Sequence, residues 1–391
     1  MMKKMKHPID DEERKMKNFM KDLPSEVSFR RPSSEEELWA FWSEPTLSPC
    51  GGGGGITDSA THTPATNQPI ITDIIKSFLL RLDQSYCMGD LLIQFWAPIT
   101  TETGGVQLVT SDQPFAISYH LDERLLKYRK HCLQYKFNVD EVEHLGILDE
   151  VEHLGIPGRV FRRKWHQCMP DVRLFSTKEY PQRDFALACD ILETTSLPVF
   201  QTSFQECVGV LEFTATTNTN LDRTIEWYMK YKLQRQRAGL KTSFSILELL
   251  CKQNCDRDLN LVAEIRQGLG VVCKTHNLPF AYAWVPCRRC NGLAIDGSMD
   301  NSYHMTVWSC SLLDDKLRSF CPSSKYAFQK GQGVEVVRRA YLSHKLCFCR
   351  DITQFSITQY PDLPVARSYG LTGCFAICLQ STCAENYHYV L

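Results

Sequence analysis

The sequence predicts an α+β protein made of two copies of one unit, each an antiparallel sheet with flanking helices. The first observation is a repeated phrase. Asp171–Pro181 reads DVRLFSTKEYP and Asp351–Pro361 reads DITQFSITQYP, so Asp, Phe, Ser, Tyr and Pro recur at the same places in both copies. We call the shift in residue number from Asp171 to Asp351 the repeat offset. The second observation is a shared order of features in both halves: an amphipathic helix, a Trp-x-Pro strand, a hairpin, a glycine turn, the phrase and paired strands. Several unrelated features in one order indicate a duplicated domain of about 150 residues per copy.

Residues 1–67 precede the first copy, and we expect them to be a disordered N-terminal tail and Gly-rich linker. Charged residues cluster in this segment, and residues 51–55 are five consecutive glycines. Such a run favours a linker because glycine loses the most backbone entropy on folding. A short, loosely docked helix over residues 35–42 is the one element that the pattern allows there.

The first copy spans residues 68–217. Its opening helix is predicted by apolar residues on one helical face: Ile71, Ile74, Ile75, Phe78 and Leu82. The β-rich runs LLIQFWAPI, TSLPVF and CVGVLEFTA predict strands, and GGVQLVTSDQPFAI predicts a turn with a hairpin partner. We expect a helix over residues 218–245 to connect the two copies.

The second copy spans residues 246–391. It opens with another amphipathic helical face: Leu261, Ile265, Leu269 and Val272. The run AYAWVPC places Trp284 where the first copy has Trp96, and the strand-like run YHMTVWSC follows. The repeat offset aligns Val390 and Leu391 with Val210 and Leu211, after which only the first copy continues, with Glu212 and Phe213. We therefore expect the last strand of the second copy to be truncated, leaving a short exposed sheet edge.

The composition argues against several function classes. The 391 residues carry a net charge of −1, which gives no global attraction for a polyanion such as nucleic acid. The longest apolar runs are too short to span a bilayer, so no membrane association is expected. The charged N-terminus lacks the apolar segment of a signal peptide. We therefore expect the 18 cysteines to be reduced and mostly buried.

No catalytic residues, cofactor or enzyme activity are predicted, because nucleophile-elbow, P-loop and dinucleotide motifs are missing from the sequence. The sharpest metal candidate combines a CRRC motif at residues 287–290 with a CFC motif at residues 347–349. Four thiolates are a ligand set for tetrahedral zinc. This spacing favours ordinary buried cysteines over a metal site, because the two motifs are far apart and the second has only one residue between its cysteines.

Several segments resemble the N-terminal region of plant NIN-like proteins, a family of nitrate-responsive transcription regulators. The resemblance covers about residues 70–391, and its most specific part is FCRDITQF. Further segments that carry it are LGIPGRVFRR, STKEYPQRDFA, THNLPFAYAWVPC and GLTGCFAICLQST. It implies that both copies are GAF-like domains. Family members also carry an RWP-RK DNA-binding domain and a C-terminal interaction domain, so we expect a member that is truncated before both.

The resemblance also implies a nitrate site near the first strands of the second copy. A small planar anion is held by Arg or His donors beside an aromatic wall that excludes water. The residues in that region that match this description are Trp284, Arg288, His304 and Trp308. Because alternate residues of a strand share a face, we expect His304, Thr306 and Trp308 to point together. The alternative is that both tryptophans are ordinary core residues.

Two departures from the family pattern bear on regulation. The family often has a phosphorylated Arg-x-x-Ser after the first hairpin, whereas this sequence has Arg129 followed by Cys132, which cannot accept that phosphate. The phrase DEVEHLGI also occurs twice in succession over residues 140–157, where we expect a longer loop. Because Cys132 stands at the acceptor position, we expect the family's phosphorylation switch to be absent from this sequence.

The leading interpretation is the regulatory, nitrate-sensing region of a nitrate-responsive transcription regulator without its own DNA-binding domain. Nitrate and other family regulators are the expected partners, and the expected location is nuclear or nucleocytoplasmic. The alternative is a non-sensing structural or interaction remnant of such a regulator. Direct contact with nucleic acid is not expected, because the basic run KYKLQRQRAGLK is typical of a solvated helix face.

Overall fold

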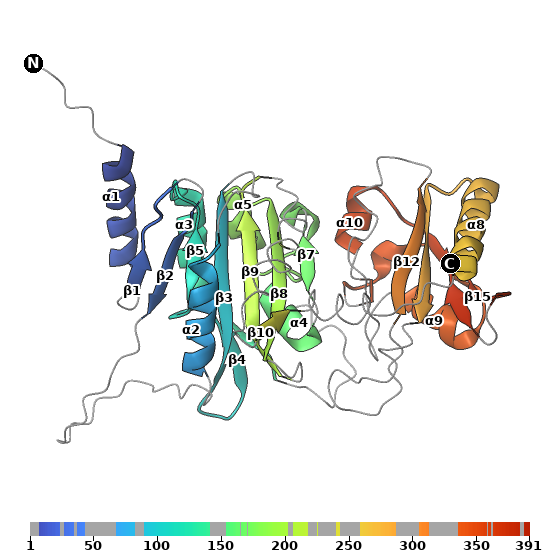
Figure 1. Ribbon diagram of the computed structural model, residues 1–391, viewed down its shortest axis with the longest axis horizontal. Helices are drawn as coiled ribbons and strands as arrows, with labels where there is room; N and C mark the ends of the chain where they lie inside the picture. Colours follow the sequence, from blue (N-terminus) through green and yellow to red (C-terminus); the bar gives the residue numbers. More distant parts are fainter. Residues whose placement is uncertain are drawn as a thin grey trace, which may run out of the picture. The chain divides into compact units, whose positions relative to one another are not determined.

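The chain divides into two compact units, residues 1–245 and 246–391 (Figure 1). The computed structural model describes residues 8–23, 27–34, 37–43, 68–82, 90–140, 154–164, 166–169, 171–201, 206–217, 225, 240–242, 259–286, 305–312, 335–357, 359–360, 363–383 and 387–391. Both units are mixed α/β with antiparallel sheets, in agreement with the predicted class. Among the described helices, none is both long and apolar enough to cross a membrane.

The first unit is built on one large sheet. Its elements are α1 (Pro8–Lys21), β1 (Val27–Arg30), β2 (Trp39–Ser43), α2 (Gln68–Leu79), β3 (Leu91–Thr100), β4 (Val106–Val109), β5 (Phe115–Ile117), α3 (Glu123–Cys132), β6 (Lys136–Asn138), α4 (Gly155–Arg163), β7 (Gln167–Met169), a 3-10 turn (Val172–Leu174), α5 (Arg183–Ala188), β8 (Glu193–Gln201), β9 (Cys207–Ala215) and β10 (Leu240–Thr242). The strand order is β1-β2-β5-β3-β9-β8-β10, with β4, β6 and β7 attached beside this path.

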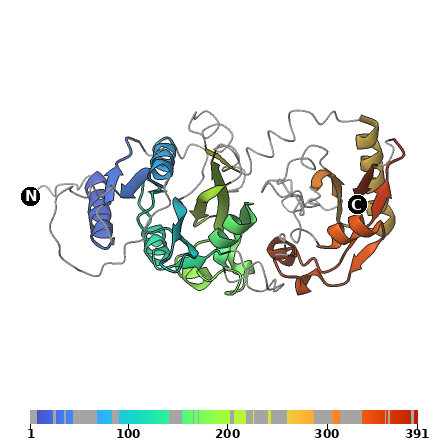
Figure 2. The same ribbon diagram turned by 90° about the horizontal axis from the view of Figure 1, so that it is seen from below.

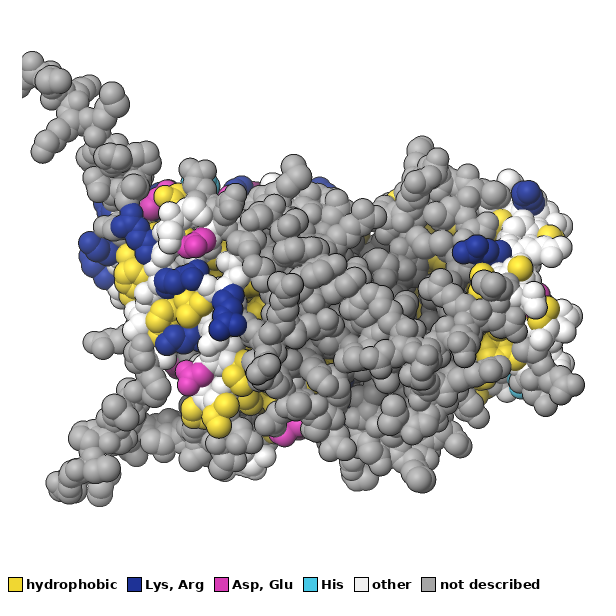
Figure 3. Space-filling view, in the orientation of Figure 1, with side chains coloured by type: hydrophobic (Ala, Val, Ile, Leu, Met, Phe, Trp, Pro, Cys, Tyr) yellow, Lys and Arg dark blue, Asp and Glu magenta, His cyan; other side chains and the backbone are white. Residues whose placement is uncertain are grey.

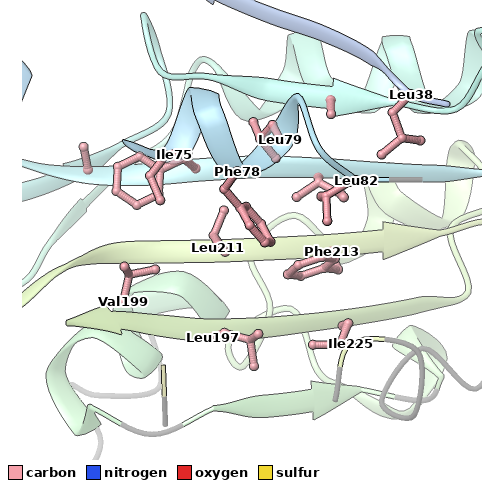
Figure 4. Packing of buried hydrophobic residues seen from close by; sticks show 14 of the residues in the cluster. Leu38, Ile75, Phe78, Leu79, Leu82, Leu197, Val199, Leu211, Phe213 and Ile225 are labelled. Atoms are coloured by element: carbon pink, nitrogen blue, oxygen red, sulfur yellow. The ribbon is translucent and has the colours of Figure 1, made fainter. Parts of the chain in front are cut away.

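Helices cover both faces of this sheet. Figure 2 shows α2 on one side and α3 and α5 on the other. On the α2 side, Phe78 and Leu82 lie against Leu211 and Phe213 of β9 in a buried cluster (Figure 4). Each such side chain contributes about 1.5–3 kcal/mol relative to leaving it in water. The predicted one-faced helix over residues 71–82 therefore forms because its apolar stripe has a sheet to cover.

The described residues 8–23, 27–34 and 37–43 belong to the fold of the first unit, which corrects the expectation of a disordered tail over residues 1–67. The segment expected as a helix over residues 35–42 instead contains most of β2, whose residue Phe41 pairs with Phe115 of β5. Their rings stack with centroids 4.6 Å apart, and Phe19 of α1 meets both at their edges. The alternation of buried aromatic residues in WAFWS suits a strand. The Gly-rich linker lies outside the described residues.

The predicted connecting helix over residues 218–245 also lies mostly outside the described residues. Within it, Leu240–Thr242 form β10, which pairs with residues 199–201 of β8. This part of the expectation is wrong because a sheet edge was available to a short segment that the sequence pattern assigned to a helix.

The second unit is built from fewer described elements. They are α8 (Leu259–His276), β11 (Phe280–Pro286), β12 (Met305–Leu312), α9 (Glu335–Ser343), β13 (Cys347–Cys349), a 3-10 turn (Ile352–Gln354), α10 (Leu363–Ser368), β14 (Cys374–Ala376), β15 (Cys378–Gln380) and β16 (His388–Val390). A four-stranded sheet has the order β12-β11-β16-β15, and β13 pairs with β14 in a two-stranded sheet. Helix α8 packs on one face and α9 on the other.

From α4 onward, the elements of the two units follow each other at the repeat offset. Helices α9 and α10 begin one repeat offset after α4 and α5. Residues Lys164 and His344, which follow α4 and α9, both have positive φ angles, 56° and 52°. Non-glycine residues rarely adopt this backbone region, so its recurrence at equivalent positions indicates equivalent helix ends.

Strand pairing repeats with the same register. Trp96 of β3 lies opposite Val210 of β9, and Trp284 of β11 lies opposite Val390 of β16. Every pair of the β13–β14 ladder matches a pair of the β7–β8 ladder after the repeat offset. The order β12-β11-β16-β15 thus corresponds to β5-β3-β9-β8 of the first unit.

The repeated phrase forms the same turn in both units. Asp171 and Asp351 have extended backbone, and each carboxylate accepts a hydrogen bond of 2.9 Å from the amide two residues later. Further along each turn, a Ser hydroxyl accepts a hydrogen bond from the amide of the residue three positions later. The side chain of that residue accepts one from the Ser amide, as in a capping box. These pairs are Ser176 with Glu179 and Ser356 with Gln359. The recurring polar residues of the phrase therefore satisfy backbone groups of a tight turn.

Candidate functional site

In each unit, the candidate functional face is the sheet face opposite the amphipathic helix α2 of the first unit or α8 of the second. In the first unit it carries Trp96 and is covered by α3, α4 and α5. In the second unit it carries Trp284 and is covered by α9 and α10. The two faces have equivalent positions in the fold but different chemistry.

Five buried residues form a polar network on this face of the first unit: Gln94, Trp96, Thr110, Arg129 and Glu212. The Glu212 carboxylate is fully buried and accepts hydrogen bonds from Trp96 Nε1 at 2.8 Å and from Gln94 Nε2 at 2.7 Å. Gln94 Oε1 in turn accepts one from Arg129 at 2.9 Å. Arg129 also donates to the hydroxyl and, at 2.8 Å, to the carbonyl of Thr110. The network thus runs from a buried carboxylate to a buried guanidinium.

Burial sets the charges of the polar network. It raises the pKa of Glu212, while hydrogen bonds from Trp96 and Gln94 act in the opposite direction. Burial lowers the pKa of Arg129 to about 10, so the guanidinium stays charged at neutral pH. The guanidinium also lies 4.6 Å from the ring centroid of Phe115. Gln94 joins the two charges, which gives each of them hydrogen-bond partners and a countercharge.

Replacing Glu212 with Gln will remove one source of pH dependence of stability. Because burial raises the pKa of Glu212 in the folded state, the stability from this group is present below the ordinary Glu value of 4.5 and is lost as pH rises. Between about pH 4 and pH 8, urea unfolding should therefore show that the stability of E212Q increases relative to that of the unaltered protein as pH rises. A constant difference between the two proteins over that range would contradict the prediction.

Buried tyrosine and cysteine side chains lie beside the polar network. The hydroxyls of Tyr128 and Tyr180 contact each other, and burial raises the pKa of both. Burial also raises the pKa of the Cys132 thiol to about 12. The described cavity at Arg129 is about 10 Å³, which is room for one water molecule. In the described part of the first unit, this face holds a buried carboxylate and a buried guanidinium in place.

In the second unit, Trp284 is the one predicted nitrate residue whose side chain the structure describes. It is 4% exposed and packs with Val336, Ala340 and Val390 in the core cluster under α9 and α10. This environment corresponds to the alternative that the sequence left open, a tryptophan that serves the core.

Trp308 lies on β12, next to Trp284 in the ladder. The partner of Ala283 is Ser309 and the partner of Trp284 is Val307, so Trp308 is the extra residue of a β-bulge. Bulges change the local direction of a strand and are frequent near functional sites. The structure therefore brings the strands of the two tryptophans together.

The other members of the predicted site are not brought together by the described residues. Arg288 and His304 lie outside them. The expectation that His304, Thr306 and Trp308 share a face assumed an unbroken alternation along the strand. The bulge interrupts that alternation at Trp308.

Comparison with known proteins identifies the family. The family model described as NLP protein GAF domain matches residues 251–391, which lie within the second unit. Protein NLP6 of Arabidopsis thaliana is 38% identical over 317 residues, covering 77% of this chain and 36% of the relative. Protein NLP7 of Arabidopsis thaliana is 37% identical over 321 residues, with coverages of 77% and 32%. Protein NLP3 of Oryza sativa subsp. japonica is 33% identical over 353 residues, with coverages of 85% and 35%.

The chain belongs to the NLP family. It spans about a third of the length of these relatives. The residues that match the NLP GAF domain include α8, the sheet β12-β11-β16-β15, and the β13–β14 pair with its repeated turn. The predicted nitrate residues of this NLP chain all fall inside the matched range.

The described cysteines of the NLP chain do not form a metal centre. Cys347 and Cys349 lie half-buried on β13, where Cys349 pairs with Cys374 of β14. The CRRC motif at residues 287–290 lies outside the described residues. Within the described ranges, no group of three or more His, Cys, Asp or Glu side chains is arranged to hold a metal ion.

Sequence reasoning missed a carboxylate that fastens α8 to the end of the NLP GAF domain. Glu264 of α8 accepts hydrogen bonds from the backbone amides of Thr382 at 3.0 Å and Cys383 at 3.2 Å. The hydroxyls of Ser381, Thr382 and Tyr389 donate to the same carboxylate. Burial acts to raise the pKa of Glu264, but these hydrogen bonds outweigh it and lower the pKa to about 2.

Replacing Glu264 with Gln will destabilise the second unit by about 1.5–3 kcal/mol, because hydrogen bonds to a charged acceptor contribute this much. The lowered pKa means that the contribution is present above the ordinary Glu value of 4.5 and is lost as pH falls through about 2. Denaturant unfolding at neutral pH measures the loss, with Glu102→Gln at an exposed turn of the first unit as the matched control. Equal stability of E264Q and E102Q would show that the contacts of Glu264 contribute nothing.

Proposed function

We propose that this chain is the ligand-sensing regulatory region of a nitrate-responsive NLP transcription regulator. The observation that carries the proposal is the match of the NLP GAF domain to residues 251–391, because this range contains every residue of the predicted nitrate site. The proximity of the Trp284 and Trp308 strands supports the same location. In this proposal the chain acts by binding, with no catalytic step.

Both units are GAF-like domains in this proposal, over residues 68–217 and 246–391. The support is the common strand order and the repeated register, with Trp96 opposite Val210 and Trp284 opposite Val390. The two domains have different tasks. The first holds the buried polar network and serves as a scaffold, whereas the second binds the ligand.

Nitrate binds in the second unit through Arg288 and His304, with Trp284 and Trp308 as the aromatic wall. A guanidinium suits a planar oxyanion because its donors lie in one plane and can form two parallel hydrogen bonds. Fixed donors are needed because a monovalent anion is only weakly attracted in a wet site. The bulge at Trp308 supports this arrangement by changing the course of β12 beside Trp284.

The chain works in the nucleus through other family regulators and makes no direct contact with DNA. On the face shown in Figure 3, the Lys and Arg side chains of the described residues lie among acidic and hydrophobic ones. A nucleic-acid surface needs basic side chains that cluster on one face. The described side chains on this face therefore do not form such a basic cluster.

The alternative function is a structural or interaction module that does not sense nitrate. The burial of Trp284 in the core cluster favours it, because a core tryptophan needs no ligand to explain its position. The two functions differ in one measurable property, which is the specific binding of nitrate.

Calorimetric titration of the 391-residue chain with nitrate, against chloride at equal ionic strength, tests the proposal. We expect saturable binding of nitrate over chloride and a loss of about ten- to a hundredfold in affinity for His304→Ala, as for a hydrogen bond to a charged ligand. His120→Ala, an exposed histidine of the first unit, is the matched control and should bind as the unaltered chain does. Equal responses to nitrate and chloride at millimolar concentration would assign the chain to the alternative.

A further inference from the structure

Two cysteines of the second unit lie opposite each other on neighbouring strands. In the β13–β14 ladder, Cys349 is the partner of Cys374, and both side chains are free thiols. Directly opposite residues of an antiparallel pair have Cα atoms about 4.5–5.5 Å apart. A disulfide needs a Cα separation of about 4.4–6.8 Å, so the backbone already holds the two thiols within bridging reach.

The two thiols also lie on the same face of this small sheet. Cys349 and Cys374 both pack against the core cluster that contains Trp284, Val336 and Ala340. Opposite residues of an antiparallel pair project to one side, with Cβ atoms about 4.5–5.5 Å apart. Because a disulfide needs a Cβ separation of about 3.5–4.5 Å, a small closing movement of the two strands completes the bridge.

The other half-buried cysteines beside this cluster have different ladder partners. Cys347 lies opposite Ala376 in the same ladder, and Cys378 lies opposite Val390 in the β15–β16 ladder. Cys347 and Cys374 are diagonal neighbours, which lie about 7–8 Å apart and thus beyond ordinary disulfide reach. In the described ladders of the second unit, two cysteines therefore stand directly opposite each other at one place only.

The same register occurs in the first unit, but without thiols. Met169 of β7 lies opposite Thr194 of β8, and these two residues are the equivalents of Cys349 and Cys374. The juxtaposition therefore belongs to the fold that the two units share, whereas the thiol chemistry belongs to the second unit.

We propose that Cys349 and Cys374 are a redox-sensitive modification site, at which a hydroperoxide converts the dithiol into a disulfide. The two thiols give up two electrons and two protons as the S–S bond forms. The hydroperoxide takes up both as its O–O bond breaks, which yields an alcohol and water, or only water from hydrogen peroxide. A thiol reductant reverses the reaction by exchange. Disulfides in reducing compartments are typically transient and redox-sensing, which fits a reversible site.

The surroundings of the pair favour the dithiol as the resting state. Both thiols are half-buried, which leaves part of each open to a small oxidant. Burial raises the pKa of Cys374 to about 12, and the nearby Cys349 acts in the same direction. The Cys374 thiol is therefore uncharged at neutral pH, and an uncharged thiol reacts more slowly than a thiolate.

The bridge joins the two ends of the segment that carries the repeated turn. Between Cys349 and Cys374 lie the turn that begins at Asp351 and helix α10. Closing a loop of about 25 residues restricts chiefly the unfolded chain, so the closed segment opens less often. Oxidation thus gives the second unit a response that the first unit lacks. The inference is independent of nitrate binding, because it uses neither Arg288 nor His304.

Disulfide mapping of the 391-residue chain tests the inference. The chain is treated with hydrogen peroxide, the remaining thiols are blocked with N-ethylmaleimide, and its peptides are analysed by mass spectrometry. We expect a linked pair of peptides that contain Cys349 and Cys374, which dithiothreitol separates. The link should be lost in C349S and in C374S. It should remain in C378S, the matched control, because Cys378 packs against the same cluster.

Hydrogen–deuterium exchange of the unaltered chain measures the consequence without any variant. Peptides covering residues 351–360 should exchange about three- to tenfold more slowly after oxidation, and dithiothreitol should restore the faster exchange. Absence of the link between Cys349 and Cys374, a link of either one to Cys347, or sulfenic and sulfinic acids at both positions without a link would overturn the inference. Unchanged exchange in a chain that carries the link would overturn the effect of the bridge on the turn.

Discussion

Replacing Arg129 with Met will lower the free energy of unfolding of the first unit by about 3–5 kcal/mol, as expected when one member of a buried charge pair is removed. The substitution keeps much of the apolar stem but leaves the Glu212 carboxylate buried without a cation. Gln94 Oε1 and the Thr110 carbonyl also lose hydrogen bonds that Arg129 donates to them. The loss is therefore much larger than for a surface charge.

Denaturant unfolding followed by tryptophan fluorescence measures this loss, because Trp96 is fully buried beside Glu212. Lys127→Met, an exposed cation on the same helix, is the matched control and should change stability by less than about 1 kcal/mol. The double variant R129M/E212Q should lose less than the sum of the single variants, because both belong to one network. Additive losses would contradict the coupling of the two charges.

Replacing Trp284 with Ala will lower the stability of the second unit by about 3–5 kcal/mol, the usual range for a buried aromatic residue cut to alanine. Its side chain is 4% exposed and lies in the cluster that joins β11 and β16 to α9 and α10. Removing it leaves a cavity among Val336, Ala340 and Val390 that the surrounding helices cannot fully close.

Urea unfolding of W284A measures this effect, and Trp284→Phe is its matched control because it keeps an aromatic ring in the cluster. We expect the loss for W284F to be less than half of that for W284A. A loss below about 1 kcal/mol for W284A would contradict the core position of this residue. The result also decides the choice of variant for nitrate titration, since a chain that is partly unfolded cannot report on binding.

The elements with strong local patterns could be predicted from the sequence. The helical faces at residues 71–82 and 261–272 became α2 and α8, and the runs LLIQFWAPI and CVGVLEFTA became β3 and β9. The repeated phrase was equally informative, because Asp and Ser bond backbone groups within a few residues of themselves. Interactions between residues that are close in the sequence can therefore be predicted from the sequence pattern.

Long-range partners explain what could not be predicted. The strand at Trp39–Ser43 was missed because the residue that stacks on Phe41 is Phe115, far along the chain. Glu212 and Arg129 were missed for the same reason, since each is ordinary within its own segment and only the fold joins them through Gln94. A lone carboxylate inside the apolar run CVGVLEF was the signal that could have indicated a buried polar network.

The predicted nitrate site shows a further limit of prediction from the sequence. The resemblance indicated the strands and their order, but the alternation argument for His304 and Trp308 could not foresee the bulge at Trp308. Bulges depend on how two strands meet, which periodicity within one strand does not reveal.

Hydrogen–deuterium exchange of the 391-residue chain most directly tests the claim that the two units share one fold from α4 and α9 onward. Peptides covering residues 171–180 and 351–360 should show similar protection, because their turns make the same hydrogen bonds. Peptides covering the equivalent strands β7 and β13, at residues 167–169 and 347–349, should both be protected, because these strands pair with β8 and β14 in the same register. An unprotected turn at residues 351–360 beside a protected one at residues 171–180 would contradict it.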